Sequence, residues 1–318
     1  MNYFKDLLNI EDSIIATIAW FSNMDRPICF EELKKYLWRN ETEDQNLNES
    51  LAKLLLQGKI KSHKYNFSDF RGVYYLLSDN KEAFEKFKKR SEIRTTLMNR
   101  AKNISILLRF VPFIRGIYVC NSLAFDASKK GSDIDFLIVT SKKRMFICRL
   151  FVTLITQLMK IRRHGNRIEK RVCLSFYTEE NNINLQKIAL KNDIYLTYWI
   201  AFLKPLSGFL TYEEILKKNE WILHYLPNFQ PRKAHGSIIV LDLISAPFKY
   251  LIEIVLNITY LSTLINSISG SLQKYRANRK YKKLKKGAFN IISNNMLKFH
   301  DQDRGKEFLE NWIEKLKD

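Results

Sequence analysis

Cysteine is scarce in this sequence, and the spacing that marks a disulfide-stabilised or zinc-binding fold is missing. The 318 residues include four cysteines, which stand far apart at Cys29, Cys120, Cys148 and Cys173. Both kinds of fold use closely spaced cysteines, so we expect four free thiols. A secretion signal is missing too, because Asp6, Glu11 and Asp12 interrupt the region where its basic and apolar parts would stand. Both absences predict a cytoplasmic protein.

An uninterrupted apolar run of membrane-spanning length is also missing. Residues 238–268 are strongly apolar, but Asp242, Lys249 and Glu253 interrupt them. A membrane-spanning helix needs about 20 predominantly apolar residues. We therefore expect a buried core helix here and do not expect a membrane partner. A helix on a membrane surface and a helix that crosses the membrane are the alternatives.

Acidic residues are few compared with basic ones. The chain has 53 Lys and Arg against 33 Asp and Glu, which gives a formal net charge of +20. This charge favours a polyanionic partner such as nucleic acid, an anionic membrane or a phosphate-bearing substrate. The alternative is an excess of lysine spread over the surface without a specific site. Residues 273–286 are rich in Lys and Arg and contain no acid, so this basic C-terminal region is a candidate for nucleic-acid or phospholipid contact.

Two aspartates, Asp133 and Asp135, open the apolar run GSDIDFLIV of residues 131–139. The run predicts a buried strand, and alternate residues of a strand point to the same side. Two carboxylates held that close repel each other unless a cation lies between them. Mg²⁺ typically binds one or two protein carboxylates together with substrate phosphates. The motif therefore predicts a metal site for phosphoryl transfer.

A second short apolar run, residues 117–120, ends at the polar pair Asn121–Ser122 before the aspartates. This strand, turn and Asp-x-Asp strand resemble the nucleotidyltransferase superfamily, whose core is the palm-like domain of DNA polymerase β. The resemblance covers roughly residues 105–180. Asn121 stands where the family has glycine. Among the residues other than glycine, asparagine is the one least disfavoured in a turn with positive φ. The family's third carboxylate has no clear counterpart, and the strand-like run 171–177 offers Ser175 there.

The resemblance implies a Mg²⁺- or Mn²⁺-dependent enzyme that transfers a nucleoside monophosphate from an NTP, such as ATP, to a protein, RNA or small-molecule acceptor. It implies that Asp133 and Asp135 hold the metal and that the turn of Asn121 and Ser122 binds the nucleotide phosphates. Lys129 or Lys130, on the loop before the aspartates, would neutralise phosphate charge. We also expect residues 142–144, Lys-Lys-Arg, to lie at the mouth of the site. The alternative function is a nucleic-acid-binding regulator with a catalytically degenerate transferase fold.

The patterns predict an α+β protein in three parts. Residues 1–90 are expected to form a winged helix-turn-helix, with helices at 11–21, 30–38 and 47–56 and strands at 59–65 and 73–77. Residues 91–180 are expected to form the nucleotidyltransferase core, a mixed sheet with flanking helices, and residues 181–318 a helical region. The wing, with Lys59, Lys61 and Lys64, is the candidate DNA contact. A packing or protein-contact module is the alternative for this first part.

Overall fold

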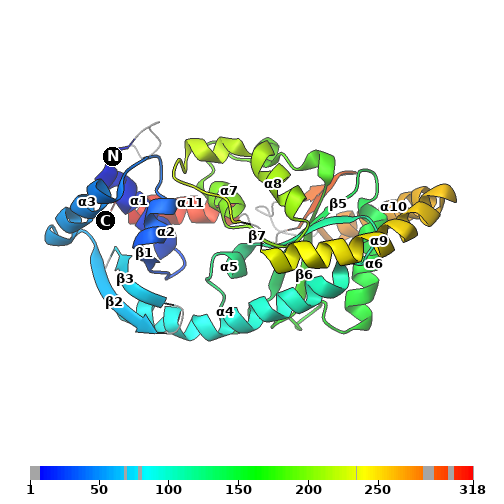
Figure 1. Cartoon of the computed structure of the whole chain (residues 1–318), viewed down its shortest axis with the longest axis horizontal. Helices are drawn as coiled ribbons and strands as arrows, with labels where there is room; N and C mark the ends of the chain where they lie inside the picture. The colour runs from blue at the N-terminus through cyan, green and yellow to red at the C-terminus, as the bar shows by residue number, and fades with distance from the viewer. Residues whose placement is uncertain are drawn as a thin grey trace.

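The computed structural model describes residues 8–67, 70–77, 81–233, 235–281, 290–299 and 304–317. This part of the chain is an α+β protein with two sheets, as the sequence predicts (Figure 1). The four cysteines are free thiols, also as predicted. The basic C-terminal region expected at residues 273–286 is described only up to residue 281, and its basic residues from position 282 onward lie outside the described residues.

The N-terminal part is a small α/β module in which each expected helix and strand is present. Its elements are α1 (Ile10–Ser22), β1 (Ile28–Cys29), α2 (Phe30–Lys35), α3 (Asp44–Leu56), β2 (Lys61–Phe67) and β3 (Phe70–Leu76). The three strands form an antiparallel sheet in the order β1-β3-β2. Helix α1 begins at Asn9, whose side chain accepts a hydrogen bond from the Asp12 amide, as N-cap residues do.

A six-stranded mixed sheet forms the centre of the molecule. Along the chain come α4 (Lys81–Leu108), β4 (Ile114–Val119), α5 (Asn121–Ala124), β5 (Ile134–Thr140), α6 (Met145–Leu158) and β6 (Val172–Glu179). The strand order is β7-β4-β5-β6-β9-β8. Strands β5 and β6 are parallel, and the other neighbours are antiparallel. Every residue of β5 is buried, which explains its continuous apolar pattern.

The region from residue 181 onward contains strands as well as the expected helices. Its helices are α7 (Ile194–Ala201), α8 (Phe209–Lys218), α9 (Gly236–Ile258), α10 (Leu261–Tyr281) and α11 (Arg304–Lys315), with short 3-10 helices at 180–182, 185–188 and 220–224. It also supplies β7 (Lys204–Ser207), β8 (Ile291–Ile292) and β9 (Met296–Lys298) to the central sheet. The backbone of β7 pairs with β4, so this region is not purely helical. The boundary expected at 90/91 falls inside the continuous helix α4.

The expectation of a buried helix at 238–268 is wrong. On α9, large apolar side chains such as Leu243, Leu251 and Ile258 are exposed, whereas Ser245 and Glu253 are buried. The polar side of this helix faces the protein, so its apolar content did not indicate burial. Among the described residues, no helix has both the length and the apolar character to cross a membrane.

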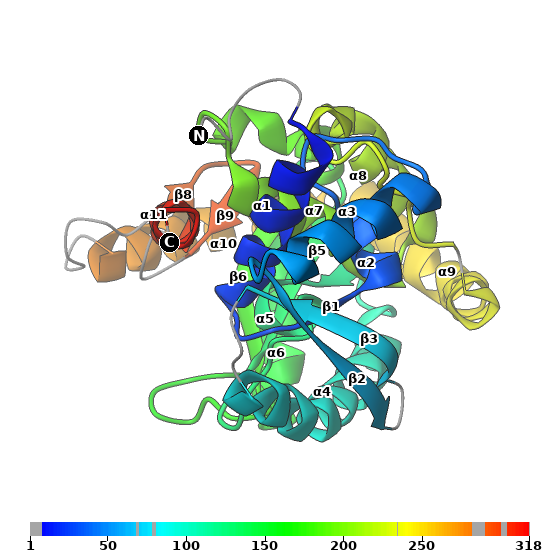
Figure 2. The ribbon, with the colours of Figure 1, turned by 90° about the vertical axis from the view of Figure 1, so that its left-hand side faces the viewer.

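Helix α11, near the C-terminal end of the chain, packs against the N-terminal module (Figures 1 and 2). Trp312 is fully buried, and its indole N–H donates to the Ala16 carbonyl of α1 at 2.8 Å. Its ring meets that of Trp38 edge-on, with centroids 5.8 Å apart. Helix α11 also packs against α7. The first and last segments of the chain thus share one aromatic core.

We predict that Trp312→Ala lowers the free energy of unfolding by about 3–5 kcal/mol, because it leaves a cavity in this core and removes the indole hydrogen bond. Chemical denaturation followed by circular dichroism measures the change. Lys317→Ala, at the exposed end of the chain, is the control and should be neutral. A loss below about 1 kcal/mol for the Trp312 variant would contradict the docking of α11.

Candidate active site

The two aspartates of the motif share one side of the sheet edge. Asp133 lies directly before β5 and Asp135 lies within it. Carboxylate oxygens of both residues and the Cys173 Sγ atom lie within 4.8 Å of one another. Cys173 is on β6, where it is the register partner of Asp135. The third group beside the two carboxylates is therefore the Cys173 thiol. Ser175, which we expected on this strand in place of the family's third acid, is not in the cluster.

The turn that precedes the aspartates places a side chain behind them. Asn121 has a φ of 56°, so the prediction of a left-handed residue at the family's glycine position is confirmed. Its side chain is buried, and its Oδ1 accepts a hydrogen bond from the Trp199 indole N–H at 2.8 Å. The Asn121 side chain also hydrogen-bonds Asp135. Asn121 therefore orients the Asp135 carboxylate from within the protein.

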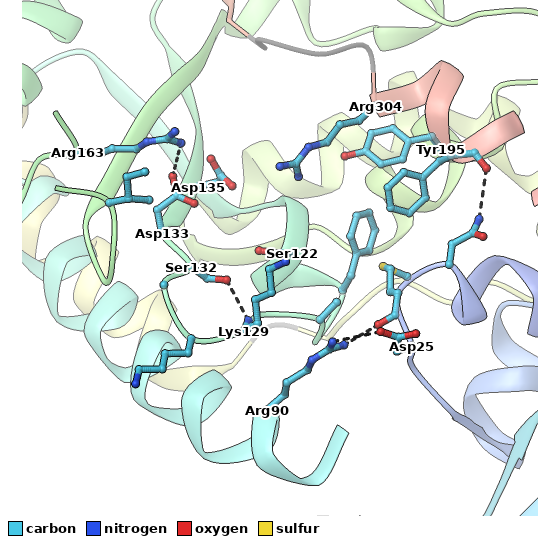
Figure 3. Close-up of a pocket in the computed structure, with 18 residues that line it drawn as sticks. Asp25, Arg90, Ser122, Lys129, Ser132, Asp133, Asp135, Arg163, Tyr195 and Arg304 are labelled. Carbon is cyan, nitrogen blue, oxygen red and sulfur yellow. Dashed lines mark hydrogen bonds and ion pairs between the residues drawn. The ribbon is translucent and has the colours of Figure 1, made fainter. Parts of the chain in front are cut away.

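The other predicted residues meet the aspartates at one cleft of about 490 Å³. Ser122, Lys129 and Lys130 line it together with both carboxylates. Figure 3 shows the Lys129 side chain reaching toward Ser122, on the same side as Asp133. The loop between them is fixed locally, because the Lys129 amide donates to the Ser132 hydroxyl at 2.9 Å. The volume is in the range of small-molecule sites.

Distant segments complete the walls of the cleft, and sequence reasoning did not identify them. Arg90 of α4 and Asp25, which follows α1, form an ion pair at one side. Arg304 of α11 and Tyr195 of α7 form the opposite side (Figure 3). Phe308 of α11 also lines the cleft. The rings of Tyr195 and Phe308 lie 5.1 Å apart. Only the tertiary structure brings these segments to the aspartates.

Arg163 is the closest cation to the pair. Its guanidinium donates to an Asp133 carboxylate oxygen at 2.6 Å. From the sequence we assigned no role to Arg163. It lies nine residues before β6, but its amide donates to the Val172 carbonyl at 2.9 Å, which places it beside the start of that strand. Strands β5 and β6 are parallel, so their starts lie at the same edge of the sheet. This strand pairing is a tertiary feature, so no local sequence signal identified Arg163.

The basic residues 142–144 are not at the cleft, contrary to our expectation. They follow the far end of β5, a strand of seven residues, which places them about 20 Å away along the strand. Arg144 instead hydrogen-bonds Asn257 and Thr263 at the junction of α9 and α10. The cations at the cleft come from the loops that precede the strands, from α4 and from α11.

Burial and like charge together set the protonation of the aspartate pair. Burial, and then the charge of Asp133, raise the pKa of Asp135 to about 6. Burial also raises the pKa of the Cys173 thiol. Sulfur is a soft ligand, whereas Mg²⁺ and Mn²⁺ prefer oxygen ligands. The donor set therefore amounts to two carboxylates, which suits Mg²⁺ or Mn²⁺ with further oxygen ligands from a substrate.

Comparison of the chain with models of protein families finds no match, and neither do comparisons with curated proteins and with solved structures. The resemblance to nucleotidyltransferases therefore rests on the motif residues themselves and on the cleft in which Ser122, Lys129, Asp133 and Asp135 meet.

We predict that Asp135→Asn stabilises the metal-free protein at pH 8 by about 1–3 kcal/mol. A carboxyl group whose pKa is raised on folding is harder to ionise in the folded protein, so stability falls as the pH rises from about 4 to about 6. Asparagine avoids this cost. Denaturation in EDTA at pH 4 and pH 8 measures the difference, which should be present at pH 8 and vanish at pH 4. Higher stability of the wild type at pH 8 would overturn this account.

Proposed function

We propose that this protein is a divalent-metal-dependent nucleotidyltransferase that moves a nucleoside monophosphate from an NTP to an acceptor hydroxyl. The observation that carries the proposal is the meeting of Asp133, Asp135, Ser122 and two lysines at one cleft. A pair of adjacent carboxylates, a small hydroxyl-bearing turn and cations are the groups that phosphoryl transfer needs, because the reaction depends on positioning and charge neutralisation.

The order of strands and turns around the cleft also supports this proposal. Strand β4, the turn at Asn121, and strand β5 with Asp133 at its start follow the order of the nucleotidyltransferase motif. Strand β6 lies next to β5, so the sheet provides the later strand that carries the family's third acid. Here Cys173 stands beside the pair on that strand. The order helix, strand, helix, helix, strand, strand of the N-terminal module supports a winged helix.

Asp133 and Asp135 would hold Mg²⁺ or Mn²⁺, which would polarise the phosphates and orient the reacting oxygens. Two carboxylates suffice for such an ion when substrate phosphates supply further ligands. Arg163 already balances the charge of Asp133, which keeps the pair together before substrate binds.

The remaining residues of the cleft would bind and orient the nucleotide. The Ser122 hydroxyl and the amides of its turn would donate to the triphosphate, and Lys129 and Lys130, both exposed on the same wall, would neutralise it. Tyr195 and Phe308, on the opposite wall, offer aromatic faces against which a base can stack. The cleft thus has a phosphate side and a base side. The chemistry of the acceptor, whether protein, RNA or small molecule, is not specified by these groups.

A nucleic-acid-binding regulator is the second candidate, and the exposed lysines of the N-terminal module favour it. Lys59, Lys61 and Lys64 are exposed on β2 and just before it. Helix α3, by contrast, is a poor reader of DNA, because its one base, Lys53, is ion-paired with Glu11. Any DNA contact would therefore use the wing and the phosphate backbone. Salt-dependent gel shift on random duplex DNA tests this candidate.

We predict that the wild type binds at least one of ATP, GTP, CTP and UTP in the presence of Mg²⁺ and that EDTA abolishes the binding. Loss of groups that merely orient a metal ligand lowers metal affinity by about 10–100-fold. Asp133→Asn and Asp135→Asn should weaken Mg²⁺-dependent nucleotide binding by at least this factor, because they remove the metal ligands themselves. Isothermal titration calorimetry measures both effects, and any NMP transfer should fall to background.

Glu169→Gln is the matched control, because Glu169 is an exposed acid on the loop that precedes β6 and does not line the cleft. It should bind nucleotide as the wild type does. Equal affinity of the wild type and both aspartate variants, or binding that EDTA does not change, would refute the proposed metal site.

A further inference from the structure

Helix α9 has its polar side toward the protein and its apolar side toward the solvent. The Glu253 carboxylate is buried, accepts from the Phe113 amide and forms a two-bond ion pair with Arg115. Asp242 accepts from the Gly208 amide at 2.8 Å, and the Lys249 ammonium donates to the Ile114 carbonyl at 3.0 Å. These contacts hold the helix to the central sheet by its charged residues. They fix an orientation that leaves the apolar side uncovered.

The exposed side of α9 is apolar along much of its length. We term it, together with the exposed apolar stripe of α10, the hairpin face. On α9 it consists of Leu243, Phe248, Leu251, Val255 and Ile258, each at least 54% exposed. Helix α10 follows directly and packs against α9. Exposed residues at helical spacing, Leu264, Ile268 and Leu272, continue the face along it. Monomeric proteins in water rarely expose apolar surface on this scale, which marks sites of protein or membrane contact.

Cations without acids border the hairpin face. From Ile254 to His300 the sequence has no Asp or Glu. On α10 the apolar stripe runs through Ile268 and Leu272 into Arg276 and Arg279, which are exposed on the next turns. The same side of one helix therefore changes from apolar to cationic. A cluster of basic residues directly beside an apolar helix surface is attracted to anionic lipid headgroups.

A cationic cavity of about 600 Å³ opens beside this stripe, between α6, β6 and α10. Arg149, Arg162, Arg163, His164 and Arg276 line it, and no acid does. Leu272 of the hairpin face is also part of its wall. A phosphate group held at this cavity would lie next to the apolar surface, as the headgroup of a phospholipid lies next to its acyl chains.

We propose that the hairpin face binds the surface of an anionic lipid bilayer. Helices α9 and α10 lie in the membrane interface with their apolar side toward the acyl chains, and Arg276, Arg279 and the adjoining cavity contact lipid phosphates. The junction of α9 and α10 is at the end of the molecule remote from the N-terminal module (Figure 1). This proposal replaces our expectation that the protein has no membrane partner. It does not depend on nucleotidyl transfer.

Charge favours an anionic surface as the occupant of the hairpin face. Arg276 and Arg279 are exposed on α10 after its apolar stripe, so a second copy of the chain covering the same stripe would bring like charges together, which repulsion disfavours. An anionic lipid surface is attracted by the same border and accepts the apolar side chains. Phe248 and Tyr250 of α9, both exposed, are residues of the kind found at the membrane–water interface.

Co-sedimentation of the full chain with vesicles tests the proposal. We expect binding to phosphatidylcholine vesicles that contain phosphatidylglycerol, and much weaker binding to phosphatidylcholine alone. The double variant Leu251→Glu, Val255→Glu changes exposed side chains only and should lower the partition coefficient by about tenfold or more. Arg276→Gln with Arg279→Gln should weaken binding to the anionic vesicles by about fivefold per charge and leave neutral vesicles unaffected.

Leu56→Glu is the matched control, because Leu56 is 91% exposed on α3 in the N-terminal module. It should bind anionic vesicles as the wild type does, and circular dichroism should show that all variants are folded. Equal sedimentation of the wild type and the Leu251, Val255 variant would overturn the proposal. So would a wild-type dimer in sedimentation velocity that ignores vesicles and that the same variant converts to a monomer, because a second copy would then cover the face.

Discussion

The repulsion between Asp133 and Asp135 is the constraint around which the cleft is arranged. Their oxygens and the Cys173 sulfur lie within 4.8 Å of one another, and burial with like charge raises the pKa of Asp135 to about 6. Arg163 pairs with Asp133, and Asn121 hydrogen-bonds Asp135 from behind. Arg163 thus offsets part of the negative charge of the pair. An ion with two positive charges and substrate phosphates would complete the balance.

A second electrostatic contact joins the segments that form the walls of the cleft. Asp126, which follows α5, lies 2.6 Å from Lys204 of β7 and 3.6 Å from both Arg26 and Arg94. Burial opposes ionisation, but these three cations lower the pKa of Asp126. The contact ties the N-terminal module, α4 and β7 to the loop of the candidate site. With the aromatic core around Trp312, it holds the N-terminal module against the central sheet, which suits a packing role for the module.

The hairpin of α9 and α10 differs from the rest of the chain in which side chains it buries. In most of the molecule apolar side chains are buried in one core, whereas α9 buries Glu253 and exposes Leu251. The cleft and the hairpin face are thus built in different ways. The cleft combines charges from many segments, while the hairpin face is apolar and continues into cations along one helix.

Local pattern sufficed for the elements and for the motif. The helices of the N-terminal module, strand β5 and the positive φ of Asn121 follow from residue types and spacing, because strand alternation and turn sterics act over a few residues. The sequence alone thus determined that Asp133 and Asp135 form a same-side pair beside a small turn. Tertiary structure decided which groups surround that pair, since Arg163, Tyr195 and Arg304 reach it through strand order and helix docking. It also decided that α9 faces outward, because apolar composition is the same whether a helix turns its charged side to the solvent or to the protein.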